Sequence, residues 1–150
     1  YVLVAPTRSL VGSVQISGRV VTATLHKLEE RGYDTRRISQ ATARSPIAPV
    51  KKTGIEAMGT TNDCNIYYGS VCLVVEGYDP VFETLPSRTS PDYGRPFSRV
   101  LGDAGYDFLK VDSMLAFSPA EVTINDSESG EVYHFGSPNA DVLLESFGVR

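Results

Sequence analysis

The 150-residue sequence has no tryptophan and very little histidine or cysteine. It offers a transition metal only two histidines, His26 and His134, and two cysteines, Cys64 and Cys72, which lack Cys-x-x-Cys spacing. Zinc sites draw most of their ligands from these two residue types. We therefore expect no metal site, reduced and buried thiols instead of a disulfide, and histidines that are structural or solvated.

The sequence also lacks an excess of positive charge and any long apolar run. Lys and Arg number 14 and Asp and Glu number 18, and the basic residues are dispersed apart from two adjacent pairs. A nucleic-acid-binding domain normally carries a basic patch. A membrane-spanning helix needs about 20 apolar residues in succession. The sequence therefore predicts neither a nucleic-acid partner nor a membrane span.

The first residue is not a methionine. The chain opens on Tyr1-Val2-Leu3-Val4, which has the composition of a strand already in progress, and we expect that strand to extend over 1–5. The simplest interpretation is that Tyr1 is not the natural start. We therefore expect the chain to be a fragment, or a processed half, of a longer protein.

The next predicted element is a helix from near Ser13 to Arg31. Apolar or small residues recur at spacings of three and four, as on the buried face of a helix, at Val14, Gly18, Val21, Leu25 and Leu28. Lys27 is expected to face away from that side. Gly32 is expected to end the helix, because glycine adopts the left-handed conformation that closes one.

Further along the chain, turn residues and apolar spacing predict short elements of both kinds. Strands are predicted over 36–42, 65–76, 121–125 and 131–135, the second as two strands or one kinked strand and the last two as a hairpin. Helices are predicted over 53–58, 80–85, 97–104 and 139–147, with a long loop over 86–96. Because helices and strands mix without strict alternation, we predict an α+β fold with a mixed sheet and packed helices.

The chemical motifs in the sequence are weak. Gly12 and Gly18 bracket a polar run, but no Gly-Lys-Ser/Thr ending follows, which excludes a phosphate-binding P-loop. Neither histidine lies in a nucleophile-elbow sequence, so nothing supports a Ser-His-Asp triad. The strongest feature is Arg19, a single arginine on an otherwise small or apolar helix surface, which is expected to have an anionic or polarised partner. Ser9 and Ser13 lie where a helix start attracts polar ligands, with simple helix capping as the alternative.

Several runs of the sequence, taken together, resemble methenyltetrahydromethanopterin cyclohydrolase of methanogenic and related archaea. One run extends from Ser9 to Val21, and another is Asp92-Tyr93-Gly94-Arg95-Pro96-Phe97. Further runs lie at 4–7, 46–50, 57–59, 61–63, 85–87, 106–108, 118–122 and 146–148. All fall in the order of the family along the whole chain. Because the family's proteins are about twice as long, the resemblance is to their C-terminal half, so that residues 1–150 would form that half without the N-terminal one.

The resemblance implies a cytoplasmic enzyme of archaeal one-carbon metabolism and methanogenesis. Such an enzyme reversibly hydrates the methenyl bridge of a tetrahydromethanopterin cation to the 5-formyl form, without a metal or a nucleotide cofactor. It also implies two α+β domains, with the pterin in the cleft between them, and assembly as a homotrimer. The partners implied for this chain are a pterin substrate and the missing N-terminal half.

Position 22 departs from the family. The resemblance implies a glutamate three residues after Arg19, one helical turn away, as the base that deprotonates water, but this chain has Thr22. A threonine hydroxyl ionises far too weakly to act as a base near pH 7. Either the rate is greatly reduced, or Thr22 positions a water that another group activates. Asp63 is the best remaining local carboxylate, with a structural turn or cap role as its alternative.

The resemblance thus implies two catalytic residues, Arg19 to orient water or substrate and Thr22 at the position of the base. The substrate contacts that it implies are Ser9, Gln15, Asn62, Asp63 and Tyr93. The alternative function is that of a pterin-binding or oligomer-forming homologue, or fragment, with impaired catalysis.

Overall fold

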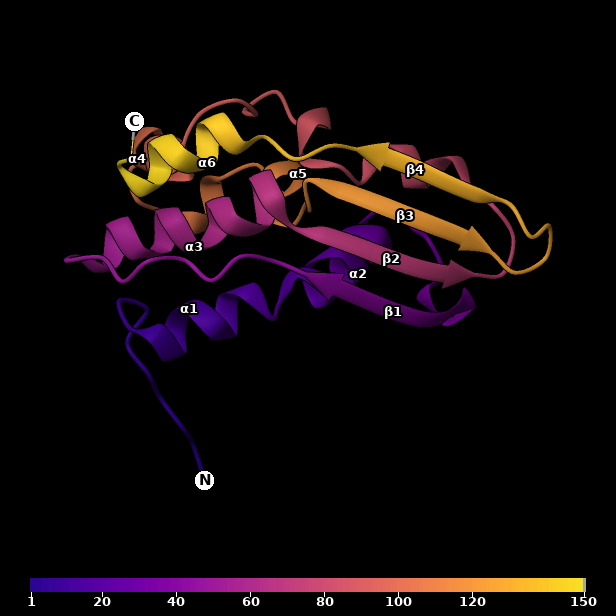
Figure 1. Cartoon of the computed structure of the whole chain (residues 1–150), viewed down its shortest axis with the longest axis horizontal. Coiled ribbons are helices and arrows are strands. Elements are labelled where there is room, and N and C mark those ends of the chain that lie inside the picture. The colour runs from indigo at the N-terminus through magenta and orange to yellow at the C-terminus, as the bar shows by residue number, and fades with distance from the viewer. Residues whose placement is uncertain (150) are drawn as a thin grey trace.

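A computed structural model describes residues 1–149, and Figure 1 shows how they are arranged. Across these residues, four strands form one sheet in the order β1-β2-β3-β4. They are β1 (Ile38–Arg44), β2 (Ser70–Val75), β3 (Glu121–Asp126) and β4 (Val132–Gly136). The central pair is parallel and both outer pairs are antiparallel. The sheet is therefore mixed, and the predicted α+β class is confirmed.

The helices gather behind the sheet and at the end where β2 and β3 begin (Figure 1). They are α1 (Leu10–Ser17), α2 (Val20–Glu30), α3 (Gly54–Tyr68), α4 (Phe97–Asp103), α5 (Ser113–Ala116) and α6 (Ala140–Phe147). Short 3-10 turns occupy Thr35–Arg37, Pro80–Thr84, Ser87–Thr89 and Phe108–Lys110. α2 packs against β1 and β2, whereas α3 packs against α1, α4 and α6.

The two faces of the sheet differ, because successive side chains of a strand point to opposite sides. One face forms a hydrophobic core with α2 that includes Val20, Leu28, Val71, Leu73, Val75, Phe82, Val122 and Ile124. The other face carries polar side chains in rows across the strands, one of them Thr42, Cys72, Thr123 and His134. Those four residues are half-buried or exposed, so within residues 1–149 this face is open to solvent.

A second hydrophobic core surrounds α3, the longest helix. Its buried side chains include Cys64, Ile66, Tyr67, Phe97, Leu101, Leu115 and Leu143. The predicted end of this helix near Gly59 is wrong. The helix starts with a capping box between Thr53 and Glu56, and it continues past Gly59 because that glycine lies against α4. A Cβ there would lie 2.7 Å from the Cβ of Ser98, so only glycine allows the two helices this close.

The predicted strand over 65–76 is half wrong. Ile66 and Tyr67 belong to the last turns of α3, and β2 begins only at Ser70. Their β-branched and aromatic side chains favour a strand, but in the helix both are fully buried in the second core, and this packing outweighs a weak local preference. Gly69 separates helix from strand. A Cβ there would meet the carbonyl oxygen of Asn65 at 2.5 Å.

The predicted single helix from Ser13 to Arg31 is two helices. α1 begins earlier, at Leu10, and the chain bends at Gly18 and Arg19, where the Arg19 N–H donates to the Ile16 carbonyl in a tight i to i−3 bond of 3.1 Å. A bend of this kind changes which residues share a face. The predicted apolar face is therefore wrong for Val14, which is exposed.

The predicted strand over 1–5 is also wrong for the described residues, where Tyr1 to Val4 belong to no strand and are highly exposed. The remaining elements agree with prediction to within two residues: β1, α4, the β3–β4 hairpin, and α6, which Asn139 caps and left-handed Gly148 ends. Gly32 is left-handed as well. The thiols are reduced as expected, Cys64 buried within α3 and Cys72 half-buried on β2, and both histidines are exposed.

Lys27 contradicts the expectation that it faces solvent, because it is only 1% exposed. Its Nζ donates to Ser118 Oγ at 2.6 Å, to the Leu85 carbonyl at 3.0 Å and to the Met114 carbonyl at 3.3 Å. Removal from water, with a further contribution from the positive charge of Arg31, lowers the pKa of Lys27 to about 7. These hydrogen bonds link α2 to Leu85, just before the 3-10 turn Ser87–Thr89, and to Met114 and Ser118, which precede strand β3.

We predict that the free energy of unfolding rises from pH 7 to pH 9 and that Lys27→Met removes most of this rise. Between these pH values the unfolded chain binds a proton on Lys27 that the folded chain does not, so folding becomes more favourable as pH increases. The expected gain is about 2 to 3 kcal/mol, to be measured by urea unfolding. Lys52→Met, at an exposed lysine, is the control and should keep the wild-type slope. An unchanged slope in Lys27→Met would contradict the prediction.

Candidate functional site

The bend between α1 and α2 presents Arg19 next to the C-terminal half of α3. Arg19 lines a small cavity of about 20 Å³ together with Asn62, Asn65, Phe108 and Phe117. Within residues 1–149 the guanidinium of Arg19 makes no hydrogen bond and no ion pair. The anionic or polarised partner expected from the sequence is therefore absent from the described part of the chain, and the five donors of the guanidinium stay available to a ligand.

Thr22 lies one turn after Arg19 and is exposed like it. Its hydroxyl donates to the Arg19 carbonyl at 3.0 Å, which leaves the lone pairs of the hydroxyl oxygen open. Asn62 is fixed by its amide, which donates to the Met58 carbonyl at 2.8 Å. Of the predicted residues, Arg19 and Asn62 therefore line one cavity, whereas Thr22 lies one turn from Arg19 and does not line it.

The other predicted contacts lie elsewhere. Ser9 caps α1, its hydroxyl accepting from the Gly12 N–H at 3.0 Å and donating to the Pro6 carbonyl. Gln15 lines a separate hollow near the start of the chain. Tyr93 packs its ring on Tyr67, with 5.2 Å between the ring centroids. These three side chains do not line the cavity of Arg19.

Asp63 is fully buried beneath α4 and does not line that cavity either. Its carboxylate accepts from the Phe97 N–H at 2.8 Å and from the Ser146 hydroxyl at 2.5 Å. Burial raises the pKa of Asp63 to about 7, against the opposing effect of these two hydrogen bonds. This geometry fits the structural alternative, in which Asp63 caps the start of α4.

Sequence reasoning missed Asn65, Phe108 and Phe117. Asn65 lies three residues after Asn62, so a helix recognised through Tyr68 would have placed both amides on one face. The two phenylalanines come from segments near α5 that carry no regular pattern. Phe117 also contacts the ring of His26 edge-on, at a centroid distance of 4.9 Å, which extends the aromatic wall along α2.

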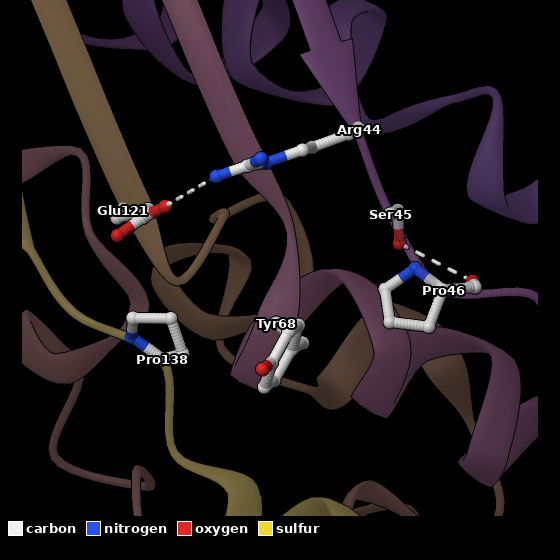
Figure 2. Close-up of a pocket in the computed structure, with 6 residues that line it drawn as sticks. All are labelled: Arg44, Ser45, Pro46, Tyr68, Glu121 and Pro138. Atoms are coloured by element: carbon white, nitrogen blue, oxygen red, sulfur yellow. Dashed lines mark hydrogen bonds and ion pairs between the residues drawn. The ribbon is translucent and has the colours of Figure 1, made fainter.

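A larger cavity of about 390 Å³ lies where α3 ends at Tyr68 (Figure 2). Its lining residues are Arg44, Ser45, Pro46, Tyr68, Glu121 and Pro138. Figure 2 shows the Arg44 side chain extending across β2 toward Glu121, with 3.9 Å between Nη2 and Oε1. Ser45 connects the two cavities, because its hydroxyl donates to Asn65 Oδ1 at 2.6 Å. None of these residues was predicted as a site.

Within residues 1–149 no group of three His, Cys, Asp or Glu side chains is arranged to hold a metal ion. The helices of the same part of the chain are all too short or too polar to cross a membrane. The described residues thus form an α+β domain in which a free arginine, two amides and aromatic rings line a small cavity, and the Ser45–Asn65 hydrogen bond links it to a larger one.

Comparison with known proteins identifies the family. The profile of the family Cyclohydrolase (MCH) matches residues 1–147. The chain belongs to this cyclohydrolase family.

Several relatives carry the name methenyltetrahydromethanopterin cyclohydrolase. The protein of Methanocella arvoryzae is 53% identical over 150 residues, which are 99% of this chain and 47% of the relative. The protein of Methanospirillum hungatei is 50% identical over 97% of this chain and 47% of its own length. That of Methanothermobacter marburgensis is 45% identical over 99% and 48%. The chain therefore spans about half the length of the relatives that it matches.

We predict that Asp63→Ala lowers the free energy of unfolding at pH 5 by about 1 to 3 kcal/mol, because it leaves the buried Phe97 N–H without an acceptor. Asp63→Asn keeps an acceptor and should lose clearly less stability.

The wild-type chain should also lose stability from pH 4 to pH 7, since the folded state binds a proton on Asp63 that the unfolded state releases. Urea unfolding at pH 4, 5 and 7 measures these effects. If Asp63→Asn kept the pH dependence of the wild-type chain, Asp63 would not be its cause.

Proposed function

We propose that this chain is the C-terminal half of a methenyltetrahydromethanopterin cyclohydrolase. Such an enzyme reversibly converts 5,10-methenyltetrahydromethanopterin and water to the 5-formyl compound and a proton, in archaeal methanogenesis. The observation that carries the proposal is the family match over residues 1–147, together with relatives of that name at up to 53% identity. The position of Arg19 in a cavity with free donors supports it.

The reaction requires three events at the bridging carbon. The oxygen of water forms a bond to the amidinium carbon, and the water loses one proton to a base, which releases it to solvent. The bond from that carbon to N10 then breaks as the hydroxyl of the adduct becomes the formyl carbonyl and its remaining proton passes to N10. Arg19 would act by hydrogen bonding, because its free guanidinium favours the oxygen that gains negative character as the proton leaves. Asn62 beside it would fix the approach of the ligand.

In this proposal, Thr22 occupies the place of the base. Its hydroxyl donates to the Arg19 carbonyl, so its oxygen can accept a hydrogen bond from a water molecule and hold it near Arg19. The hydroxyl does not take up the proton at neutral pH. The proposed substrate contacts Ser9, Gln15 and Tyr93 rest on the family resemblance, whereas the buried Asp63 is left with its structural role.

The remaining half of the enzyme would supply the other wall of the cleft. We propose that it packs on an apolar surface formed by Leu3, Val4, Leu10, Val11 and Val14, all of them highly exposed. Part of this surface lines a hollow of about 450 Å³. Apolar patches of this kind normally mark an interface. We further propose a homotrimer in the cytoplasm, with a tetrahydromethanopterin derivative as substrate and no metal or nucleotide cofactor.

A second candidate function is that of a pterin-binding half with impaired catalysis. The observation that favours it is the threonine at position 22, since within residues 1–149 no carboxylate lines the cavity of Arg19. The two functions differ in turnover and not in ligand binding.

We predict that Thr22→Glu raises the rate of methenyl hydrolysis by about 10² to 10⁴, because it introduces a base one turn from Arg19. The measurement is the loss of methenyl absorbance, with the chain mixed with the N-terminal half. Thr22→Gln has the same length without the charge and should give no gain. An equal rate in wild type and Thr22→Glu would show that the base lies elsewhere.

We predict that Val11→Asp weakens association with the N-terminal half at least tenfold, because it places a charge within the apolar surface. Val132→Asp on β4 is a matched control, since Val132 and Val11 are 63% and 65% exposed. Co-purification of the two halves, followed by titration, measures the effect. Equal binding by both variants would argue against this interface.

A further inference from the structure

Glu121 faces the larger cavity with its hydrogen-bonding capacity unused. It begins β3, where its N–H donates to the Gly69 carbonyl at 3.1 Å, and its side chain is only 13% exposed. Two side chains approach the carboxylate, Arg44 at 3.9 Å and His134 at 3.6 Å, and both distances exceed that of a hydrogen bond. Within residues 1–149 its oxygens accept no hydrogen bond. The side chain is half-buried and both oxygens are free to accept, so this carboxylate is suited to a ligand that donates.

The walls of the cavity are flat and rigid. Tyr68, at the end of α3, is 44% exposed, and among the described residues its hydroxyl has no partner. Its neighbour Tyr67 is fully buried in the second core, so only Tyr68 is accessible to a ligand. Figure 2 shows the Tyr68 ring between Pro46 and Pro138. An aromatic ring between two prolines favours a planar ligand that stacks on the ring, and the fixed backbone of proline limits adjustment.

Arg44 completes the arrangement at the mouth of the cavity. Its side chain is 85% exposed, so the loose ion pair with Glu121 contributes little and does not occupy the guanidinium. The edge of a ligand that faces both side chains would meet a two-oxygen acceptor and, next to it, a forked donor. The complementary edge carries two adjacent N–H donors followed by a carbonyl oxygen.

We infer that this cavity binds the 2-amino-4-oxopyrimidine edge of a pterin ring. The 2-amino group and N3–H of that edge donate to the two oxygens of Glu121, its O4 accepts from Arg44, and the ring stacks on Tyr68. This inference deepens the proposed function by assigning the pterin a place in this half of the enzyme. Guanine carries the same hydrogen-bonding edge, so the test must distinguish a pterin from a guanine ligand.

The place of the cavity fits the rest of the site. Ser45 lines it and donates to Asn65, and Asn65 lines the cavity that holds Arg19. The two cavities are therefore lined by directly hydrogen-bonded neighbours, which links the pocket for the ring to the cavity of the arginine that would act on the reactive carbon. A ligand larger than its ring could engage both regions.

The test is equilibrium binding of 6,7-dimethylpterin to the chain, followed by the fluorescence of the ligand. The probe should bind at least tenfold more tightly than 6,7-dimethyllumazine, which has a second oxo group in place of the 2-amino donor, and more tightly than guanosine. Equal binding of pterin and lumazine, absence of saturable pterin binding, or tighter binding of guanosine would overturn the inference.

Matched variants locate the binding. Glu121→Gln should weaken pterin binding at least tenfold with an unchanged melting temperature, and Tyr68→Leu should weaken binding of pterin and lumazine alike. Glu131→Gln, at an exposed glutamate next to β4, is the control and should bind as wild type. Wild-type affinity in Glu121→Gln would overturn the assignment.

Turnover is measured separately, so the two proposals fail in different ways. A wild-type chain that binds pterin through Glu121 but shows no hydrolysis with the N-terminal half would refute the proposed activity and support pterin binding in this cavity. Full hydrolysis by Glu121→Gln, with unchanged KM, would refute pterin binding in this cavity but not the proposed activity.

Discussion

The structure depends on the end of α3, where Asn65 holds four segments together. Its carbonyl accepts from the Gly69 N–H that ends the helix and from the Ala120 N–H that precedes β3. Its amide donates to the Ile16 carbonyl in α1 at 3.0 Å and accepts from the Ser45 hydroxyl after β1 at 2.6 Å. Gly69 makes this possible, because any side chain there would collide with the Asn65 carbonyl. Both cavities lie on the flanks of this one junction.

Two buried ionisable side chains reinforce the arrangement on either side of it. Lys27 fastens α2 to the segments before the Ser87–Thr89 turn and β3, and Asp63 fastens α3 to α4 and α6. In both cases the partners are mostly backbone groups or hydroxyls, so the side chain replaces hydrogen bonds that water would otherwise provide. Neither group lines the cavity of Arg19, which separates the groups that hold the fold from those that would meet a ligand.

Part of the site could be predicted from the sequence, because its signals depend only on adjacent residues. Arg19 stands out because its neighbours are small or apolar, and Ser9 and Gly32 follow capping rules that involve only adjacent residues. The β3–β4 hairpin and α6 were predictable for the same reason. Glu121, Tyr68 and Arg44 were not, because each belongs to a different element and nothing in its own neighbourhood marks it. They become a site only because β1 and α3 end, and β3 begins, at the same edge of the sheet.

The errors have a common cause in tertiary contacts. Gly59 signals a helix end in isolation, but it remains helical because α4 approaches at that point. Ile66 and Tyr67 favour a strand, but burial in the second core keeps them in α3. The sequence by itself determined the family, the α+β class, the end of α6 at Gly148 and the unusual residue Thr22, since these depend on residue identity and short spacing. Only the tertiary structure decided that Lys27 is buried, that Asp63 is a cap and that a carboxylate at the start of β3 faces a cavity, because burial and long-range hydrogen bonds exist only once distant segments have packed together.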